Sequence, residues 1–400
     1  MALLKIYSKE VVTIMEHHVV IVDCNHMLHT FYNGMQNRLS YRVPIGNGQF
    51  EEKDTTIHNG MIKNIFKWSM AGHLPTALCF DRPCISRKAF FQESIKGMVI
   101  GSGKEYKGNR EKMPDEMFSA SRDVYEVLKS VGASCYAVDG YEADDIIFAC
   151  IKRAKEKYPG MHIDVITNDA DLLPLVSDEV SVYLRSKRGT FAEDKTYEKT
   201  HYIEFTPRNY QEEVERLSSY NKFIMPYNSI LLHKLLRGDS SDQFGLKEIS
   251  KMFPPTKWNS MMTQMMADQV NFKEVFRYGE PQVKIMNRVT GEEFQGTMEE
   301  ALKSPEKANL YRKVCNPEEL DAIIDLLKEY SDLSDEQLRL IEKVYWGMNL
   351  NMVYPNKDKR LSRSPLVIPE GGKPGVPDIG TFSETELRVV ANRLFGINLK

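Results

Sequence analysis

The stretch HHVVIVDCN, residues 17–25, is a short run of β-branched side chains that ends in Asp23. Such side chains favour a β-strand. Four later stretches have the same character, and two of them end in an aspartate, Asp81 and Asp169. They are TALCFD (76–81), SCYAVDG (134–140), HIDVITND (162–169) and VSVYLRS (180–186).

Helical patterns alternate with these strands, at about 52–70, 115–131, 142–157 and 169–177. The alternation predicts an α/β fold, with a mainly parallel twisted sheet and helices on both faces. Ligands of such sheets bind outside the carboxyl ends of the strands. Asp23, Asp81 and Asp169 all stand at predicted carboxyl ends, so we expect them to meet at one edge of the sheet.

The composition is that of a soluble globular protein, with 42% hydrophobic and 27% charged residues among 400, enough for two or three packed units. No apolar run is long enough to span a membrane, and no signal peptide is recognisable. The six cysteines form no CxxC pair, which favours reduced thiols in the cytoplasm over a zinc site. The net charge of −3 does not by itself indicate a nucleic-acid-binding protein.

The carboxyl-terminal part has weaker signals. A helix is predicted at 227–237, the stretch 269–315 has no clear pattern, and 355–380 is rich in Pro and Gly, as in a linker or an irregular wrap. Three helix starts are recognisable: Asn316 with Pro317, and the capping boxes Ser334 with Gln337 and Ser383 with Glu386.

The stretch YEADDIIFAC, residues 141–150, places Glu142, Asp144 and Asp145 directly before a helical apolar face. Acidic residues in the first turn of a helix are favoured by its dipole, which is the simplest explanation. Three adjacent carboxylates repel one another, however, and their apolar neighbours predict partial burial. A nearby positive charge is therefore expected.

Other acidic residues complete a set of nine. They are Asp23, Asp81, Glu142, Asp144, Asp145, then Asp169 and Asp171 in TNDADLL, and Asp239 and Asp242 in RGDSSDQ. Each alone is explained as a cap or turn residue, but their joint placement at one sheet edge calls for cations. Hard oxygen ligands select Mg²⁺ or Mn²⁺. Two such ions ~4 Å apart can activate a water and stabilise an in-line phosphoryl displacement.

Basic residues gather between the second and third of these acids. From Arg82 to Lys112 there are eight Lys or Arg against three Glu, with Phe90, Phe91 and Tyr106 interleaved. Basic and aromatic side chains together suit a phosphate backbone and an unstacked base, although a solvated loop has the same composition. The stretch RSKRG, 185–189, is a smaller basic patch with the same two explanations.

Six of these stretches occur in a fixed order across roughly residues 18–245: VIVDCN, LCFDR, EYKGNREKMPDEM, YEADD, TNDADLLPLV and LLRGDSSDQ. In this the sequence resembles the 5′-nucleases of the flap endonuclease family, which have a PIN-like core. The resemblance is greatest to the phage and bacterial 5′→3′ exonucleases, including phage enzymes called ribonuclease H.

The resemblance implies roles for these residues. The first metal ion would be held mainly by Asp23, Asp81, Glu142 and Asp144, and the second mainly by Asp145, Asp169, Asp171, Asp239 and Asp242. The basic segment at about 82–114 would form a helical arch over the site. There Lys107 and Arg110 would contact the scissile phosphate, and Tyr106 would stack on a base. The other residues expected to contact nucleic acid are Arg82, Arg87, Lys88, Lys96 and Lys104.

The resemblance also implies a division of the chain. Residues 1–225 would form the nuclease core, and 226–268 a helix–turn–helix-like module that binds duplex and contributes Asp239 and Asp242. Residues 269–400 would be mostly helical. Many members hold K⁺ in a Gly-rich turn of that module. This chain reads QFGLKEISKMFPP there and keeps only Gly245, so the resemblance leaves the presence of a K⁺ site undecided.

The implied function is a metal-dependent, structure-specific 5′-nuclease that cuts near junctions of duplex and 5′ single strand in DNA, or in RNA–DNA hybrids, during primer or flap removal. The alternatives are a PIN-type ribonuclease and a catalytically inactive binding module. We expect a monomer in the cytoplasm of a bacterium or a phage-infected cell. The ending NRLFGINLK, 392–400, either docks on the core or recruits a replication protein such as a sliding clamp or a single-strand-binding protein.

Overall fold

The computed structural model describes the protein over residues 18–33, 40–62, 77–82, 113–130, 133–137, 142–157, 159–185, 202–239, 245–275, 282–287, 290, 292–296, 298–308, 310–315, 317–348 and 354–355.

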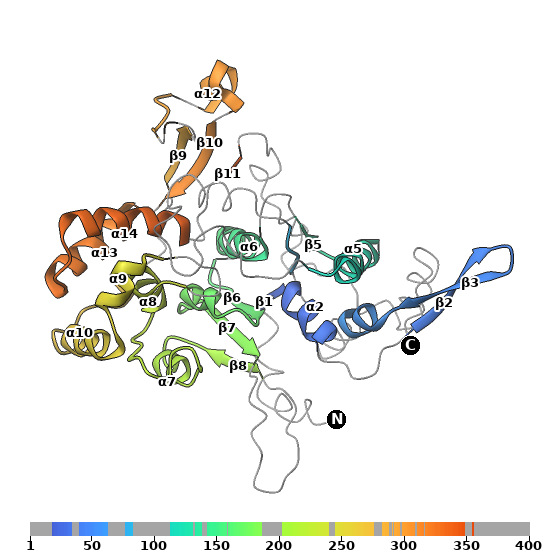
Figure 1. Ribbon diagram of the computed structural model, residues 1–400, viewed down its shortest axis with the longest axis horizontal. Coiled ribbons are helices and arrows are strands. Elements are labelled where there is room, and N and C mark those ends of the chain that lie inside the picture. Colours follow the sequence, from blue (N-terminus) through green and yellow to red (C-terminus); the bar gives the residue numbers. More distant parts are fainter. Residues whose placement is uncertain are drawn as a thin grey trace, which may run out of the picture.

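A six-stranded sheet lies at the centre, with its strands in the order β5–β4–β1–β6–β7–β8 (Figure 1). They are β1 (His18–Asp23), β4 (Ala77–Cys79), β5 (Cys135–Tyr136), β6 (His162–Thr167), β7 (Val180–Arg185) and β8 (Tyr202–Phe205). All neighbours are parallel except β7 and β8. The predicted α/β fold with a mainly parallel sheet is confirmed, and the antiparallel β8 is an addition to it.

Both faces of this sheet are buried. In β1, Val19 and Ile21 belong to one hydrophobic core, and Val20 and Val22 belong to the other. Strand β4 alternates in the same way, because successive side chains of a strand point to opposite faces. A strand buried on both faces has no polar face, which explains the continuous apolar run in β1.

Different helices cover the two faces. The core of Val20 and Val22 also takes side chains from α2 (Cys24–Asn33), from the helical residues 56–62 and from α5 (Asp115–Ser130). The opposite core begins with α6 (Ala143–Lys157) and the short 3₁₀ helix η2 (Ala170–Leu175). It continues into the remaining helices of the same side, α7 (Tyr210–Glu215), α8 (Ile230–Arg237), α9 (Lys247–Met252), α10 (Pro255–Ala267), α11 (Phe272–Val275), α13 (Pro317–Tyr330) and α14 (Asp335–Met348).

The core on the α6 side also contains polar side chains. His233 of α8 is 7% exposed and packs edge-on against the rings of Tyr220, Phe223 and Trp258. Glu319 of α13 is 2% exposed and accepts a hydrogen bond of 2.7 Å from the hydroxyl of Tyr345 in α14. Polar groups thus lie inside the helical part of the core.

Several predicted boundaries differ from the structure. The strands before Asp81 and Asp169 end at Cys79 and Thr167, two residues earlier, and the helix predicted at 169–177 is the 3₁₀ helix η2. Helix α8 starts at Ile230 rather than at 227, because a turn precedes it. The capping box of α14 is confirmed: Ser334 N–H donates to Gln337 at 2.9 Å, and Gln337 N–H donates to the Ser334 hydroxyl at 3.3 Å.

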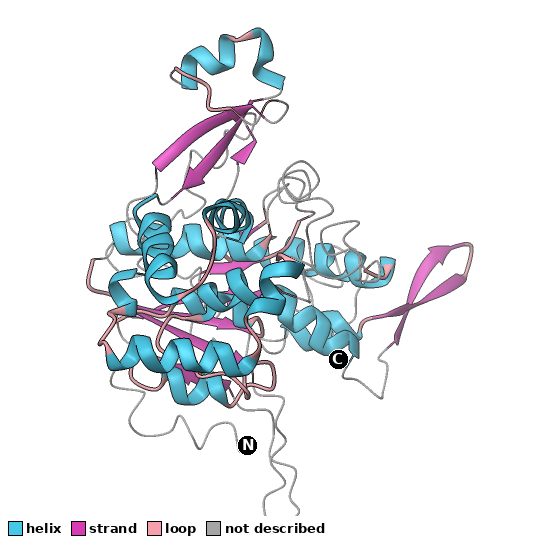
Figure 2. Cartoon of the chain, turned by 60° about the vertical axis from the view of Figure 1, so that its left-hand side comes forward, coloured by secondary structure: helices cyan, strands magenta, loops and turns pink. Residues whose placement is uncertain are grey.

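A two-stranded hairpin, β2 (Ser40–Gly46) and β3 (Gln49–Asp54), projects from the body (Figures 1 and 2). The helix predicted at 52–70 is therefore wrong at its start, because residues 52–54 belong to β3 and the helical residues begin at 56. Gly46, Asn47 and Gly48 have positive φ, which the turn requires. Phe50, beside this turn, is 61% exposed.

Gly60 lies in the helical residues 56–62, where that segment meets α2. A Cβ atom built on Gly60 would lie 2.3 Å from the Cδ1 atom of Phe31. Glycine at this position thus lets the two helical segments approach each other closely.

A second, three-stranded antiparallel sheet lies in the C-terminal part, in the order β11 (Tyr354–Pro355), β10 (Leu310–Cys315) and β9 (Gln282–Asn287). The helix α12 (Met298–Lys303) and the 3₁₀ helix η3 (Pro305–Ala308) lie at its outer end (Figure 2). This sheet is an addition to the helices expected after 269. Asn316 and residues 356–400, with Ser383 and Glu386, fall outside the described residues. Among the described helices, none combines the length and apolarity needed to cross a membrane.

Candidate active site

The structure brings the predicted strand-end acids to one edge of the sheet. Strand β1 lies between β4 and β6, and all three run parallel. Asp23 is the last residue of β1, Asp81 follows β4 by two residues, and Asp169 follows β6 by two residues. The carboxyl ends of adjacent parallel strands meet at one edge, as the sequence pattern predicts.

Asp23 is held by donors from two elements. One carboxylate oxygen accepts the N–H of Asn25 at 2.9 Å, and the other accepts the hydroxyl of Thr167 at 2.8 Å. Asp23 is only 5% exposed, and this burial raises the pKa of its carboxyl above the usual value, against the effect of the hydrogen bonds. Its backbone carbonyl contacts Nδ1 of His26, whose Nε2 lies 3.0 Å from the hydroxyl of Tyr202 in β8.

The acids of YEADD lie at the start of α6. Oδ1 of Asp81 accepts the N–H of Ala143 at 2.6 Å, and Oδ2 of Asp145 accepts the N–H of Glu142 at 3.2 Å. Free N–H groups at a helix start stabilise carboxylates in this way. Glu142 and Asp145 are 8% and 5% exposed, while Asp144 is half-buried. Asp81, Glu142, Asp144 and Asp145 therefore gather around one helix end.

The remaining described acids form a second group. Asp169 caps η2, because its Oδ1 accepts the N–H of Asp171 at 2.9 Å. Asp171 and Asp239 both contact the ammonium group of Lys234 in α8, and the Asp239 distance is 2.7 Å. Burial, together with the charges of Asp169 and Asp239, raises the pKa of Asp171 to about 7 even though Lys234 lowers it.

Lys234 was not among the residues predicted from the sequence. Its side chain is 12% exposed, and burial alone would lower its pKa. The carboxylates of Asp171 and Asp239 outweigh burial and raise the pKa of Lys234 well above the usual value. The chain itself thus supplies a positive charge to the second group of acids. The signal in the sequence is a single lysine in the apolar run ILLHKLLR.

The donor set fits a magnesium-type ion by its chemistry, because its members are hard carboxylate oxygens. In the described part of the chain, no three His, Cys, Asp or Glu side chains stand together as a finished metal-binding group. The carboxylate oxygens instead accept hydrogen bonds from backbone N–H groups, Thr167 and Lys234. A bound ion would have to compete with these donors.

Of the residues predicted to contact nucleic acid, Arg82 is the one that the structure describes. Its guanidinium lies 5.6 Å from the centre of the Tyr125 ring in α5, and Lys129 lies 5.5 Å from the same ring. The others fall outside the described residues, as does the acid Asp242: Arg87, Lys88, Lys96, Lys104, Tyr106, Lys107 and Arg110.

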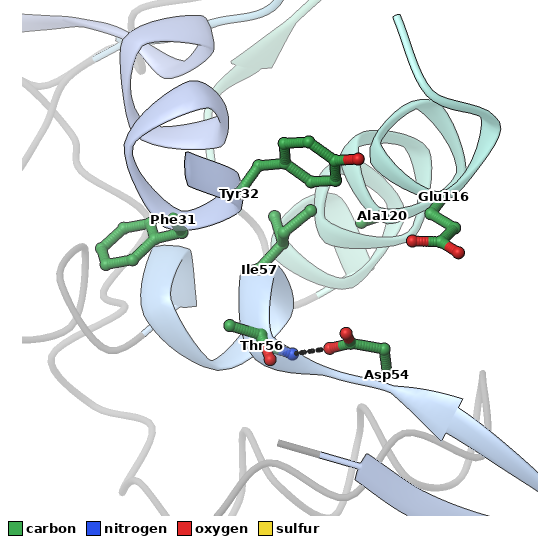
Figure 3. A pocket seen from close by; sticks show the side chains of 7 residues that line it. All are labelled: Phe31, Tyr32, Asp54, Thr56, Ile57, Glu116 and Ala120. Carbon is green, nitrogen blue, oxygen red and sulfur yellow. Dashed lines mark hydrogen bonds between the residues drawn. The ribbon is translucent and has the colours of Figure 1, made fainter. Parts of the chain in front are cut away.

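A pocket lies where the hairpin meets the body (Figure 3). Its lining residues are Phe31, Tyr32, Asp54, Thr56, Ile57, Glu116 and Ala120. Asp54 accepts the N–H of Thr56 at 2.8 Å, so this carboxylate caps the helical residues 56–62. None of the nine predicted acids lines the pocket, which is therefore separate from the candidate active site.

Residues 18–202 match the family described as 5′-3′ exonuclease, N-terminal resolvase-like domain. A 5′-3′ exonuclease of Buchnera aphidicola subsp. Schizaphis graminum is 30% identical over 109 residues, which cover 27% of this chain and 37% of that protein. DNA polymerase I of Bacillus subtilis is 32% identical over 142 residues, covering 36% of this chain and 14% of that protein.

The chain thus spans less than half the length of each of these two relatives. Among solved structures, the T5 D15 protein co-crystallised with metal ions superposes with a TM-score of 0.41 at 13% identity, covering 83% of this chain and 100% of that chain. Asp23, Asp81, Asp169 and the start of α6 lie within the segment 18–202 that matches the family by sequence. Residues 18–202 are therefore similar to the family of 5′-3′ exonuclease N-terminal resolvase-like domains.

Proposed function

We propose that this protein is a divalent-metal-dependent, structure-specific 5′-nuclease that hydrolyses phosphodiester bonds near 5′ ends of DNA or RNA–DNA hybrids. The observation that carries the proposal is the meeting of Asp23, Asp81 and the acidic start of α6 at one edge of a parallel sheet. So many carboxylates together are costly unless cations offset their repulsion.

In this proposal the ions are Mg²⁺ or Mn²⁺, and two of them bind. The first is held mainly by Asp23, Asp81, Glu142 and Asp144, and the second mainly by Asp145, Asp169, Asp171, Asp239 and Asp242. When bound, such ions activate a water and stabilise the charge that develops on the attacking and leaving oxygens. A K⁺ ion, if one binds, would bind separately from these two ions, at the turn of Gly245.

The chain's own residues then have distinct tasks. Asp81 accepts the N–H of Ala143 and would thereby hold the start of α6, with its acids, at the edge of the sheet. Lys234 offsets part of the charge of Asp171 and Asp239. Lys107 and Arg110 of the arch would contact the scissile phosphate, and Arg82, held over Tyr125, would contact the backbone of the nucleic acid next to Asp81.

We propose two substrates. One is DNA with a junction of duplex and 5′ single strand, and the other is an RNA–DNA hybrid, cut during primer removal in bacterial or phage replication. The helices α8, α9 and α10 would grip the duplex. We also propose that the protein is a monomer in the cytoplasm. Its partners would be replication proteins such as a sliding clamp or a single-strand-binding protein.

The test is substitution of Asp144 by alanine in the full chain. We expect loss of cleavage, with retained or tighter binding of a 5′-flap DNA, because negative charge is removed while phosphate contacts remain. Chelation should also stop cleavage, Mg²⁺ or Mn²⁺ should restore it, and Ca²⁺ should support binding only. Asp332→Ala, at a carboxylate that is 88% exposed and pairs with Lys257, is the control. Near-normal turnover by Asp144→Ala would contradict the assignment.

The same enzyme preparation separates the alternatives. Cleavage of a 5′-flap DNA, an RNA–DNA hybrid and single-stranded RNA should be compared under one set of conditions. Preference for the flap or the hybrid supports the 5′-nuclease, whereas cleavage of single-stranded RNA alone would favour a PIN-type ribonuclease. Binding without any cleavage would favour an inactive module.

A further inference from the structure

Thr167 is the last residue of β6 and is completely buried. Its hydroxyl donates to Oδ2 of Asp23 at 2.8 Å and accepts the backbone N–H of Asp169 at 3.0 Å. A hydroxyl has one proton to donate and lone pairs to accept, so both functions are in use. One side chain thus joins the end of β1 to the loop after β6.

The register of the sheet explains this contact. Val22 is paired with Ile166 across β1 and β6, so Asp23 and Thr167 are the next neighbours along these two strands. Both belong to the set of alternate residues whose side chains point to the face covered by α6, as Ile21 and Val165 do. A side chain at position 167 is therefore the nearest one in β6 that can reach Asp23.

The contact continues into the second group of acids. Asp169, whose N–H is held by Thr167, accepts the N–H of Asp171, and Asp171 in turn contacts Lys234. A continuous set of hydrogen bonds therefore leads from Asp23, assigned to the first ion, to the acids assigned to the second. Thr167 is the link between the two groups.

We propose that Thr167 is a positioning residue that holds Asp23 and Asp169 in the orientation in which they bind divalent ions. The inference rests on the proposed function, because it concerns the same site. Some side chains orient metal ligands through hydrogen bonds. Removal of such a side chain typically lowers metal affinity or activity by about 10- to 100-fold. A buried hydroxyl that only satisfied polar atoms would change stability and leave metal affinity as it is.

The test uses the full chain and Mn²⁺ alone, whose binding is followed by electron paramagnetic resonance in the absence of nucleic acid. Thr167→Val removes the hydroxyl and keeps the shape, and we expect Mn²⁺ affinity to fall roughly 10- to 100-fold. Thr167→Ser restores the hydroxyl and should bind Mn²⁺ nearly as well as the wild type. Cleavage of a 5′-flap DNA should fall and recover in the same order.

The control is Thr55→Val, the same substitution at another buried threonine, whose hydroxyl accepts from Asn59 at 3.0 Å. It should lower thermal stability without lowering Mn²⁺ affinity. If Thr167→Val does not fold, Thr167→Cys, with a weak donor of similar size, decides the question, because its Mn²⁺ affinity should also fall.

Wild-type Mn²⁺ affinity in a folded Thr167→Val or Thr167→Cys protein would overturn the inference and leave the proposed function intact. Loss of affinity in Thr167→Ser equal to that in Thr167→Val would also overturn it, since the hydroxyl would then be irrelevant. If the wild-type chain itself binds no Mn²⁺ and cleaves no substrate, the proposed function fails, and this inference fails with it.

Discussion

Replacement of Lys234 by methionine removes the ammonium group that contacts both Asp171 and Asp239, while it keeps the length of the side chain. Lys234 and Asp239 are 12% and 11% exposed, and Asp171 is 30% exposed. Removing one partner of a buried ion pair costs about 3–5 kcal/mol of folding free energy. Because Asp171 is partly exposed and can take up a proton, we expect a loss nearer the lower limit, roughly 2–4 kcal/mol.

The loss should depend on pH. In the wild type the pKa of Asp171 is raised to about 7, so the stability that its protonated form contributes is lost as pH rises toward and through that value. Without Lys234 the pKa of Asp171 rises further, and stability continues to fall at higher pH. The difference between variant and wild type should therefore widen from pH 6 to pH 9.

The assay is urea unfolding of both proteins at pH 6 and pH 9, with and without Mg²⁺. An ion present at 100 times its dissociation constant stabilises the folded state by about 2.7 kcal/mol. Mg²⁺ should stabilise Lys234→Met more than the wild type, because the ammonium group no longer competes for Asp171 and Asp239. Lys257→Met is the control, since its pair with Asp332 is exposed and contributes only about 0–1 kcal/mol. Equal stability of variant and wild type at pH 9 without Mg²⁺ would refute this reasoning.

Two further predictions rest on buried groups of the structure, and a third rests on the arch expected from the sequence. Burial raises the pKa of Glu319 to about 8, so the stability that this one group contributes should fall by at most roughly 1.4 kcal/mol per unit as pH rises from about 4.5 to 8, and Glu319→Gln should remove this part of the slope in unfolding measurements. Burial lowers the pKa of His233 to about 3, and in the described part of the chain neither ring nitrogen has a hydrogen-bond partner. His233→Phe should therefore raise the free energy of unfolding by about 1–3 kcal/mol and remove the part of the stability loss below pH 6.5 that comes from this histidine, whereas a destabilised variant would show that the ring nitrogens are satisfied. Lys107→Ala should slow single-turnover cleavage far more than it weakens binding, and an effect on KM alone would make this lysine an ordinary phosphate contact.

The sequence predicted the central sheet well because its signals are local. A strand that is buried on both faces reads as an apolar run in the sequence. An aspartate directly after it lies at the carboxyl edge of the parallel sheet, whichever position the strand takes in the strand order. Asp23, Asp81 and Asp169 could be brought together on that basis alone. The start of α6 was equally clear, since its acids stand directly before an apolar helical face.

What the sequence did not reveal depends on contacts between distant segments. Lys234 meets Asp239 only because the chain turns at Gly238, which has a φ of 76°, and it meets Asp171 from another element. Thr167 has no distinguishing signal in the sequence, because its contact with Asp23 depends on the pairing of β6 with β1. The hairpin did carry a local signal, the Asn47–Gly48 pair between two short strands, but the acidic residues after it also fit the start of a helix.

The alternation of β1 between two cores has a consequence for the genetics of this protein. Deletion of a single codon between Val19 and Val22 would shift the later part of the strand by one position. Side chains that now face α6 would then face α5, and Asp23 would be turned away from Thr167 and the start of α6. A one-residue deletion in β1 should therefore be a null allele, whereas a deletion of similar size in the exposed turn at Asn47 should leave a folded protein.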